Sequence, residues 1–260
     1  MAFTLHTHRD AAAQGEAMWT GLGFESARAT IERRSILPVF DRYCRPGDRI
    51  LEGGCGFGTW VDYLRGRGFR AVGIDTNAPL LSWGASKGLP LIVNDVARTC
   101  FRDGTFDAYL SLGVVEHFPE GPQAPLGEAR RVLRRGGILL VSTPCTNAFR
   151  ALVNHPARGL VNTLHRVRGR RLHFAEYRFT QRELVSHVRT AGFEVLETVL
   201  NDYRLDQDTH SIGFYTDWPI FRARGEKWRL NAPGRWLFRA LRRLSPNLVV
   251  SGILVVARKP

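Results

Sequence analysis

Four glycines crowd a short segment, ILEGGCGFGTW (residues 50–60), and an acid, Glu52, directly precedes them. The glycines are Gly53, Gly54, Gly56 and Gly58. Glycine costs backbone entropy on folding, so such a cluster indicates a left-handed turn or the close approach of a ligand. A glycine-rich turn between a strand and a helix presents backbone amides to a nucleotide. The segment therefore predicts a nucleotide-binding turn.

A second acid lies where a nucleotide-binding sheet would use one. Asp75 ends the apolar segment RAVGID (70–75), 21 residues after Gly54. In such sheets, the acid that binds a ribose hydroxyl ends the second strand about 20 residues beyond the glycine turn. The turn and Asp75 therefore support each other, which a lone glycine cluster would not do.

Alternating apolar and amphipathic segments supply the elements that would position these residues. The predicted strands cover residues 49–54, 70–75, 89–95, 106–113, 137–144, 193–200 and 248–259. The predicted helices cover residues 59–68, 78–88, 125–137, 180–192 and 234–244. Gly136 and Gly137 are expected to end the third helix, and Thr180 with Glu183 forms a capping box at the start of the fourth. Strands that alternate with helices predict an α/β fold with a doubly wound, mostly parallel sheet.

The spacing within the turn distinguishes between classes of nucleotide. A dinucleotide fingerprint is G-x-G-x-x-G or G-x-G-x-x-A, and Thr59 stands at its last position here. The spacing from Glu52 to Gly58 is instead E-x-G-x-G-x-G. With this motif the chain resembles the class I S-adenosylmethionine-dependent methyltransferases, in particular the small-molecule and glycan-pathway members with a SLGVVEHF-like segment. The resemblance continues through GID (73–75), NDV (94–96), FDAYLSLGVVEHF (106–118), RRVLRRGGILLVSTP (130–144) and FTQRELVSHVRTAGFEV (179–195).

The resemblance implies a Rossmann-like sheet of seven strands with the last strand antiparallel, and S-adenosyl-L-methionine as the cofactor. It implies that Glu52 and the turn from Gly54 to Gly58 hold the methionine part, with Gly53 also at the cofactor, and that Asp75 accepts hydrogen bonds from the ribose hydroxyls. The other residues expected at the cofactor are Thr76, beside that acid, Asp95 and Val96, at the adenine, and Leu112 and Gly113, beneath the cofactor. No metal is expected, because the sulfonium is already a strong electrophile that needs mainly alignment and exclusion of water.

His117 is the candidate catalytic residue. Its unperturbed pKa lies near neutrality, so it could act as a general base that takes a proton from the acceptor. It could equally order the loop after the fourth strand. The sequence leaves both interpretations open.

The positive charge of the chain, +13 in total, is concentrated in two segments. Residues 144–178 carry a net charge of +6 and residues 220–243 a net charge of +7, so the rest is neutral. On a helix, one face would hold Leu237, Leu241 and Leu244, and the other mostly Arg235, Arg239, Arg242 and Arg243. Such a helix suits an anionic membrane surface or an anionic substrate. The alternative is that its apolar face packs on the core.

These patterns predict an N-terminal helical cap (1–47) and a methyltransferase domain (48–260), with insertions at 144–178 and 202–247 covering the substrate side. The predicted function is methyl transfer to oxygen of a small molecule, a lipid or a lipid-linked saccharide, with an anionic acceptor and peripheral membrane contact. The first residues lack a signal peptide and the cysteines form no C-x-x-C pair, so a cytoplasmic enzyme is expected. The alternatives are an RNA methyltransferase, which the basic excess permits, and a non-catalytic or oxidoreductase nucleotide-binding protein.

Overall fold

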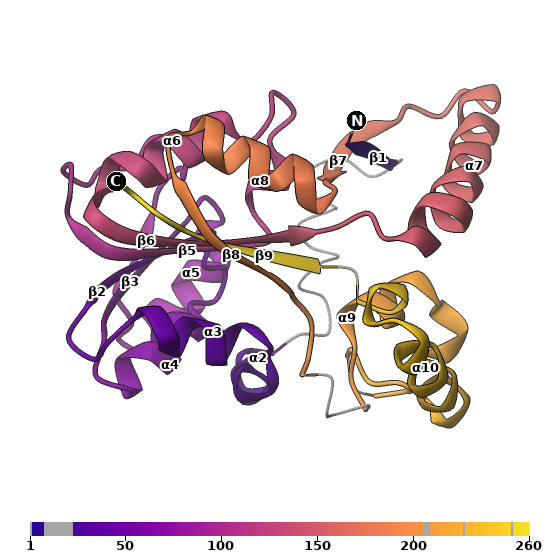
Figure 1. The fold of residues 1–260 in the computed structure, drawn as a ribbon, viewed down its shortest axis with the longest axis horizontal. Coiled ribbons are helices and arrows are strands. Elements are labelled where there is room, and N and C mark those ends of the chain that lie inside the picture. Colours follow the sequence, from indigo (N-terminus) through magenta and orange to yellow (C-terminus); the bar gives the residue numbers. More distant parts are fainter. Residues whose placement is uncertain (1, 8–22, 205–208, 226, 251) are drawn as a thin grey trace.

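A seven-stranded sheet forms the centre of the computed structural model, which describes residues 2–7, 23–204, 209–225, 227–250 and 252–260 (Figure 1). The strand order is β4-β3-β2-β5-β6-β9-β8. The strands are β2 (Arg49–Gly53), β3 (Arg70–Asp75), β4 (Leu91–Val93), β5 (Phe106–Leu112), β6 (Leu133–Pro144), β8 (Glu194–Leu200) and β9 (Gly252–Arg258). β9 runs antiparallel to β6 and β8, whereas the pairs among β2 to β6 are parallel. The expected α/β sheet with an antiparallel last strand is confirmed.

Helices cover both faces of this sheet (Figure 1). One face holds α2 (Phe24–Ala29), η1 (Ile31–Arg33), α3 (Ile36–Tyr43), α4 (Thr59–Gly66) and α5 (Ala78–Ala85), and the other holds α6 (Gln123–Val132) and α8 (Gln181–Thr190). Each face has its own cluster of buried apolar side chains, for example Phe40 and Leu64 on one and Leu126 and Leu184 on the other. The predicted capping box is present, since Glu183 N–H donates to Thr180 Oγ1 and Thr180 N–H to the Glu183 carboxylate.

The third predicted helix ends earlier than expected. The glycines at 136 and 137 do not end it, because α6 stops at Val132 and the chain enters β6 at Leu133. Leu133 is fully buried and pairs with Phe106 at the start of β5, so the sheet rather than the helix uses this apolar side chain. Gly136, with a φ of +74°, then lies in the irregular part of β6 where the register shifts.

Two strands outside the central sheet escaped the sequence analysis. β1 (Phe3–Thr7) pairs antiparallel with β7 (His173–Arg178). The segment 1–47, expected to be helical, therefore contains a strand. Its first described helix begins at Phe24, and residues 8–22 lie outside the described residues. The two strands were not predicted because each is short and is ordered by pairing with the other, which lies far away in the sequence.

The two basic segments lie at one end of the molecule, where β6 leaves the sheet (right-hand side of Figure 1). The first contains the π-helical turn η3 (Arg150–Asn154) and α7 (His155–Val167), which project from the body. The second, residues 220–243, overlaps η4 (Pro219–Phe221) and α10 (Ala232–Leu244), and is flanked by α9 (Ile212–Asp217) and η5 (Pro246–Leu248). Among the described residues, no helix is both long and apolar enough to cross a bilayer.

The apolar face of α10 packs on the protein, which was one of the two open interpretations. Phe238 is 1% exposed and lies in a buried cluster with Phe214, while Leu237 and Leu241 pack against that cluster. Leu244, in contrast, is exposed. α10 is therefore mainly a structural helix of its own small core.

A buried ion pair joins the first basic segment to the end of α9. Arg150 Nε lies 2.8 Å from Asp217 Oδ2, and the two side chains are 3% and 4% exposed. Arg178, also buried, lies 3.9 Å from Asp217 and pairs with Glu176 at 2.9 Å. The carboxylate of Asp217 thus offsets positive charge from two arginines of the first basic segment.

Candidate active site

A pocket of about 300 Å³ lies at the carboxyl ends of four neighbouring strands. It is lined by Gly54, Asp75, Thr76, Asn94, Asp95, Val96, Gly113, Val114, His117 and Phe118. These residues end or directly follow β2, β3, β4 and β5, so the strand order itself brings them together. This edge is where open α/β sheets bind their ligands.

Most of the residues predicted at the site line this pocket. Those that do are Gly54, Asp75, Thr76, Asp95, Val96, Gly113 and His117. Glu52, Gly53, Gly56, Gly58 and Leu112 are not among the lining residues, and the first four are buried. Asn94, Val114 and Phe118 also line the pocket and were not predicted from the sequence. Each of the three lies within the segments NDV and SLGVVEHF, so their place beside predicted residues was the signal available.

The glycine turn needs glycine for two reasons. Gly54, Gly56 and Gly58 adopt φ values of +71°, +54° and +76°, a region that residues with a side chain rarely occupy. In addition, a Cβ atom on Gly54 would overlap a methyl group of Val114, and one on Gly58 would lie 2.8 Å from Leu91. Side chains of the protein itself therefore approach the turn closely. Gly54 also lines the pocket, so a bound ligand would approach the turn there as well.

Asp75 ties the glycine turn to the end of β3. Its Oδ2 accepts a hydrogen bond from Gly56 N–H at 2.9 Å, and its Oδ1 accepts one from Asn77 N–H at 2.8 Å. A carboxylate oxygen can accept more than one hydrogen bond, so the ribose hydroxyls of a nucleotide could still bind here. Asp75 therefore holds the turn in shape and remains an acceptor at the pocket.

Glu52 is a buried acid at the end of β2. Its side chain is 5% exposed, and its Oε2 has no hydrogen-bond partner among the described residues. Burial raises the pKa of Glu52 well above its usual value, although a hydrogen bond with the backbone of Val61 opposes this shift. The nearby charge of Asp75 raises the pKa further. A positively charged or donor group of a ligand would satisfy this acceptor.

His117 is held by the strand β7. It ends the short helix η2 (Val115–His117), and its Nδ1 lies 2.8 Å from the carbonyl oxygen of Ala175. A carbonyl oxygen can only accept, so Nδ1 carries the proton and Nε2 of the neutral ring is a free base. Burial lowers the pKa of His117, but Glu116 and the hydrogen bond to Ala175 outweigh it, so the pKa lies above its usual value.

Glu116, next to His117, is 1% exposed, and burial raises its pKa to about 7. Two further carboxyl groups, those of Asp75 and Asp95, line the pocket itself. This concentration of acids favours a ligand with hydroxyl, amino or positively charged groups. The described residues contain no group of His, Cys, Asp and Glu side chains that could hold a metal ion.

Comparisons with known proteins agree with this geometry. Residues 51–141 match the family model described as a methyltransferase domain. Over 128 residues the chain is 32% identical to a probable fatty acid methyltransferase of Mycobacterium tuberculosis. The matched segment covers 45% of this chain and 30% of that protein. Over 99 residues it is 34% identical to the probable tRNA methyltransferase 9B of Bos taurus, which covers 37% and 21%. The chain thus spans less than half the length of these curated relatives.

The fold is similar to that of a solved structure, an S-adenosylmethionine-dependent methyltransferase from Methanosarcina mazei. The two share a TM-score of 0.58 at 19% sequence identity, over 85% of this chain and 97% of that chain. The structural likeness covers more of the chain than the residues 51–141 that match the family model. Residues 51–141 thus match a methyltransferase domain, and the fold is similar to that of a solved S-adenosylmethionine-dependent methyltransferase.

Proposed function

We propose that the protein transfers the methyl group of S-adenosylmethionine to an oxygen atom of a small-molecule, lipid or lipid-linked acceptor. The observation that carries the proposal is the pocket itself, where Gly54, Asp75 and His117 from three different strand ends meet. In the proposed division of the chain, residues 48–260 form the methyltransferase domain. The insertions at 144–178 and 202–247 form its substrate side.

The residues of the pocket fit the parts of the cofactor. We propose that Asp75 accepts hydrogen bonds from the ribose hydroxyls and that Asp95 and Val96 meet the adenine. The Oε2 of Glu52, which has no partner among the described residues, suits the amino group of the cofactor. The other proposed cofactor residues are Gly53, Gly54, Gly56, Gly58, Thr76, Leu112 and Gly113.

His117 is proposed to accept the proton of the acceptor. When bound, the cofactor supplies an electrophilic methyl group on sulfur. Where the acceptor is a hydroxyl group, His117 Nε2 would take up its proton. The hydrogen bond from Nδ1 to Ala175 keeps the ring in the tautomer that this step needs.

An anionic, amphiphilic acceptor is supported by two observations. One relative is a probable fatty acid methyltransferase. The segments 144–178 and 220–243, which hold the positive excess, lie at the same end of the molecule as the end of β6 (Figure 1). Arginine binds carboxylates and phosphates through paired hydrogen bonds, which suits such an acceptor and peripheral contact with a membrane.

RNA is the second candidate acceptor, because another relative is a probable tRNA methyltransferase. The net charge of +13 would support binding to a phosphate backbone. Against this candidate, the segment at the end of β5 (111–114) reads SLGV and is not an NPPY-type loop, the kind found in enzymes that methylate amino groups of bases.

Calorimetry tests the cofactor. S-adenosylhomocysteine should bind with micromolar-range affinity and nicotinamide dinucleotides should not. Asp75→Asn should weaken binding by about 1.5–3 kcal/mol, because a charged acceptor is lost. The matched control is Asp48→Asn, which changes an acid at the opposite end of β2 that accepts a hydrogen bond from Arg45 N–H. A preference for the dinucleotide would overturn the proposed function.

Transfer of a radioactive methyl group tests the acceptor and His117. The protein is incubated with labelled S-adenosylmethionine in four separate reactions. Each contains one acceptor, which is a long-chain fatty acid, an isoprenoid diphosphate, an isoprenoid hydroquinone or total tRNA. Label in a lipid supports the proposal, and label in tRNA alone supports the second candidate. On a hydroxyl acceptor, His117→Gln should slow turnover by about 10²–10⁴-fold with unchanged cofactor affinity. His187→Gln, a histidine on α8 beside Gln123, should have no such effect.

A further inference from the structure

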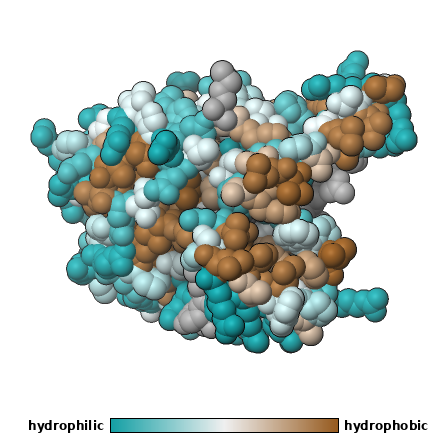
Figure 2. Space-filling model, turned by 45° about the vertical axis from the view of Figure 1, so that its right-hand side comes forward, coloured by the Kyte–Doolittle hydropathy of each residue, from teal (hydrophilic) through white to brown (hydrophobic). Residues whose placement is uncertain are grey.

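The helix α7 turns its apolar side chains away from the protein. Leu152 and Val153 of η3 and Leu160, Val161, Leu164 and Val167 of α7 are large apolar side chains that are 47% to 80% exposed. Val153, Leu160, Leu164 and Val167 recur at positions i, i+7, i+11 and i+14, which places them along one face. Figure 2 shows apolar side chains on the projecting part of the molecule at the upper right, where Figure 1 places α7.

The side of α7 that faces the protein is polar. His155 is 8% exposed, and its ring stacks on Phe3 of β1 with centroids 3.6 Å apart. Arg158, one turn further on, is partly buried. A helix that packs on a core has the reverse distribution, with its apolar face inward. Nothing among the described residues covers the apolar face of α7.

The charge around this face indicates what covers it. Four exposed arginines lie within six residues at the end of α7 and just beyond it, namely Arg166, Arg168, Arg170 and Arg171. The sequence contains no Asp or Glu between Glu128 and Glu176. A second copy of α7 would bring like charges together, whereas an anionic bilayer would supply both the opposite charge and an apolar layer.

We propose that α7 docks the protein on anionic membranes, with its apolar face in the interface and its arginines among the lipid headgroups. The sequence pattern favours α10 for this role, but two of the three leucines on its apolar face, Leu237 and Leu241, pack against a buried cluster. α7 follows β6, the neighbour of β5, so docking through α7 would bring the carboxyl edge of the sheet near the lipid. The part of this inference in which docking gives a lipid acceptor access to the pocket rests on the proposed function.

Vesicle flotation with the full chain tests the docking. Wild-type protein should float with vesicles of phosphatidylcholine and phosphatidylglycerol, less so at high salt, and not with phosphatidylcholine alone. Leu160→Gln/Leu164→Gln should weaken vesicle binding at least about tenfold, because it removes two leucines that would be buried in the membrane interface. Both side chains are exposed in the protein, so the fold does not depend on them. Arg166→Gln/Arg168→Gln should weaken it about fivefold for each charge removed.

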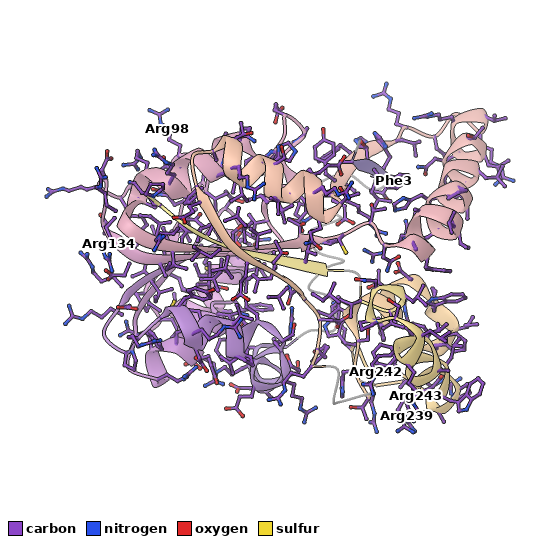
Figure 3. All side chains as sticks on the ribbon, viewed as in Figure 1. Phe3, Arg98, Arg134, Arg239, Arg242 and Arg243 are labelled. Atoms are coloured by element: carbon purple, nitrogen blue, oxygen red, sulfur yellow. The ribbon has the colours of Figure 1, made fainter. Side chains whose placement is uncertain are left out.

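The matched control is Arg239→Gln/Arg243→Gln on α10, which makes the same change of charge at exposed positions (Figure 3). It should weaken binding less than about twofold per charge, since these arginines do not flank the exposed apolar face. An equal loss in both arginine variants would overturn the assignment to α7, because net charge alone would then explain the binding.

Two other outcomes would also overturn docking. One is wild-type protein that ignores anionic vesicles and sediments as a dimer that Leu160→Gln/Leu164→Gln dissociates. The other is protein that ignores vesicles and binds tRNA through Arg166 and Arg168. Affinity for S-adenosylhomocysteine, measured on the same samples, separates the two proposals. Intact cofactor binding without vesicle binding contradicts docking alone, and absent cofactor binding contradicts the proposed function.

Discussion

Replacing Gly54 with alanine should destabilise the protein through two effects that can be measured separately. The left-handed backbone at this position, with a φ of +71°, costs an L-residue roughly 1–2 kcal/mol. The added methyl group would also overlap Val114, and overpacking of this kind costs roughly 1–3 kcal/mol. The free energy of unfolding should therefore fall by roughly 2–5 kcal/mol, which urea denaturation would measure as a lower midpoint at an unchanged slope.

Gly88 provides the matched control, because it has a φ of +76° and a Cβ atom there would meet no described atom within 4 Å. Gly88→Ala should cost the backbone strain alone, roughly 1–2 kcal/mol. Combining Gly54→Ala with Val114→Ala should recover the difference, which a double-mutant cycle reports as a coupling energy of roughly 1–3 kcal/mol. Equal losses at Gly54 and Gly88, with no coupling to Val114, would refute the packing argument for the turn.

Asp217→Asn should lower the free energy of unfolding by about 3–5 kcal/mol in urea denaturation, because it leaves Arg150 buried without its counter-charge. Arg150→Met/Asp217→Leu should lose much less, and a loss below about 1 kcal/mol in the single variant would contradict the ion-pair argument. The pKa of Glu116 should set part of the pH dependence, since it is about 7 in the folded protein and about 4.3 in an unfolded chain. The folded protein therefore binds the proton more tightly, and the contribution of Glu116 to stability, complete below about pH 4.3, is lost as the pH rises through about 7. Relative to Glu116→Gln, wild-type stability should fall over this range by at most about 3 kcal/mol, and parallel pH profiles of the two proteins would show that Glu116 is not protonated on folding.

The features that the sequence predicts well are those encoded within a single segment. Each strand from β2 to β6 carries its own apolar run, and those from β2 to β5 are followed within a few residues by a glycine or an acid. Because parallel strands end at one edge, the sequence alone is enough to place Gly54, Asp75, Asp95 and His117 together.

The features that the sequence did not predict depend on partners that lie far along the chain. β7 is short and carries charges, and it is ordered by pairing with β1. For this reason the hydrogen bond from His117 to Ala175, a residue of β7, could not be predicted from the sequence. The segments around α7 and α10 both combine leucine or valine with arginine, and this pattern alone does not tell which face turns toward the protein. Packing decides it, inward for Phe238 and outward for Leu160.

The pairing of β1 with β7 has a consequence for the order in which the site is assembled. Thr7 pairs with His173, so this contact closes a loop that contains the whole glycine turn and the strands β2 to β6. Such a long closure costs chain entropy that only later contacts offset, so it is expected to form late in folding. During synthesis the cofactor turn can take shape as soon as β5 has left the ribosome. His117 would acquire its fixed tautomer only after β7 has followed and paired with the first residues of the chain.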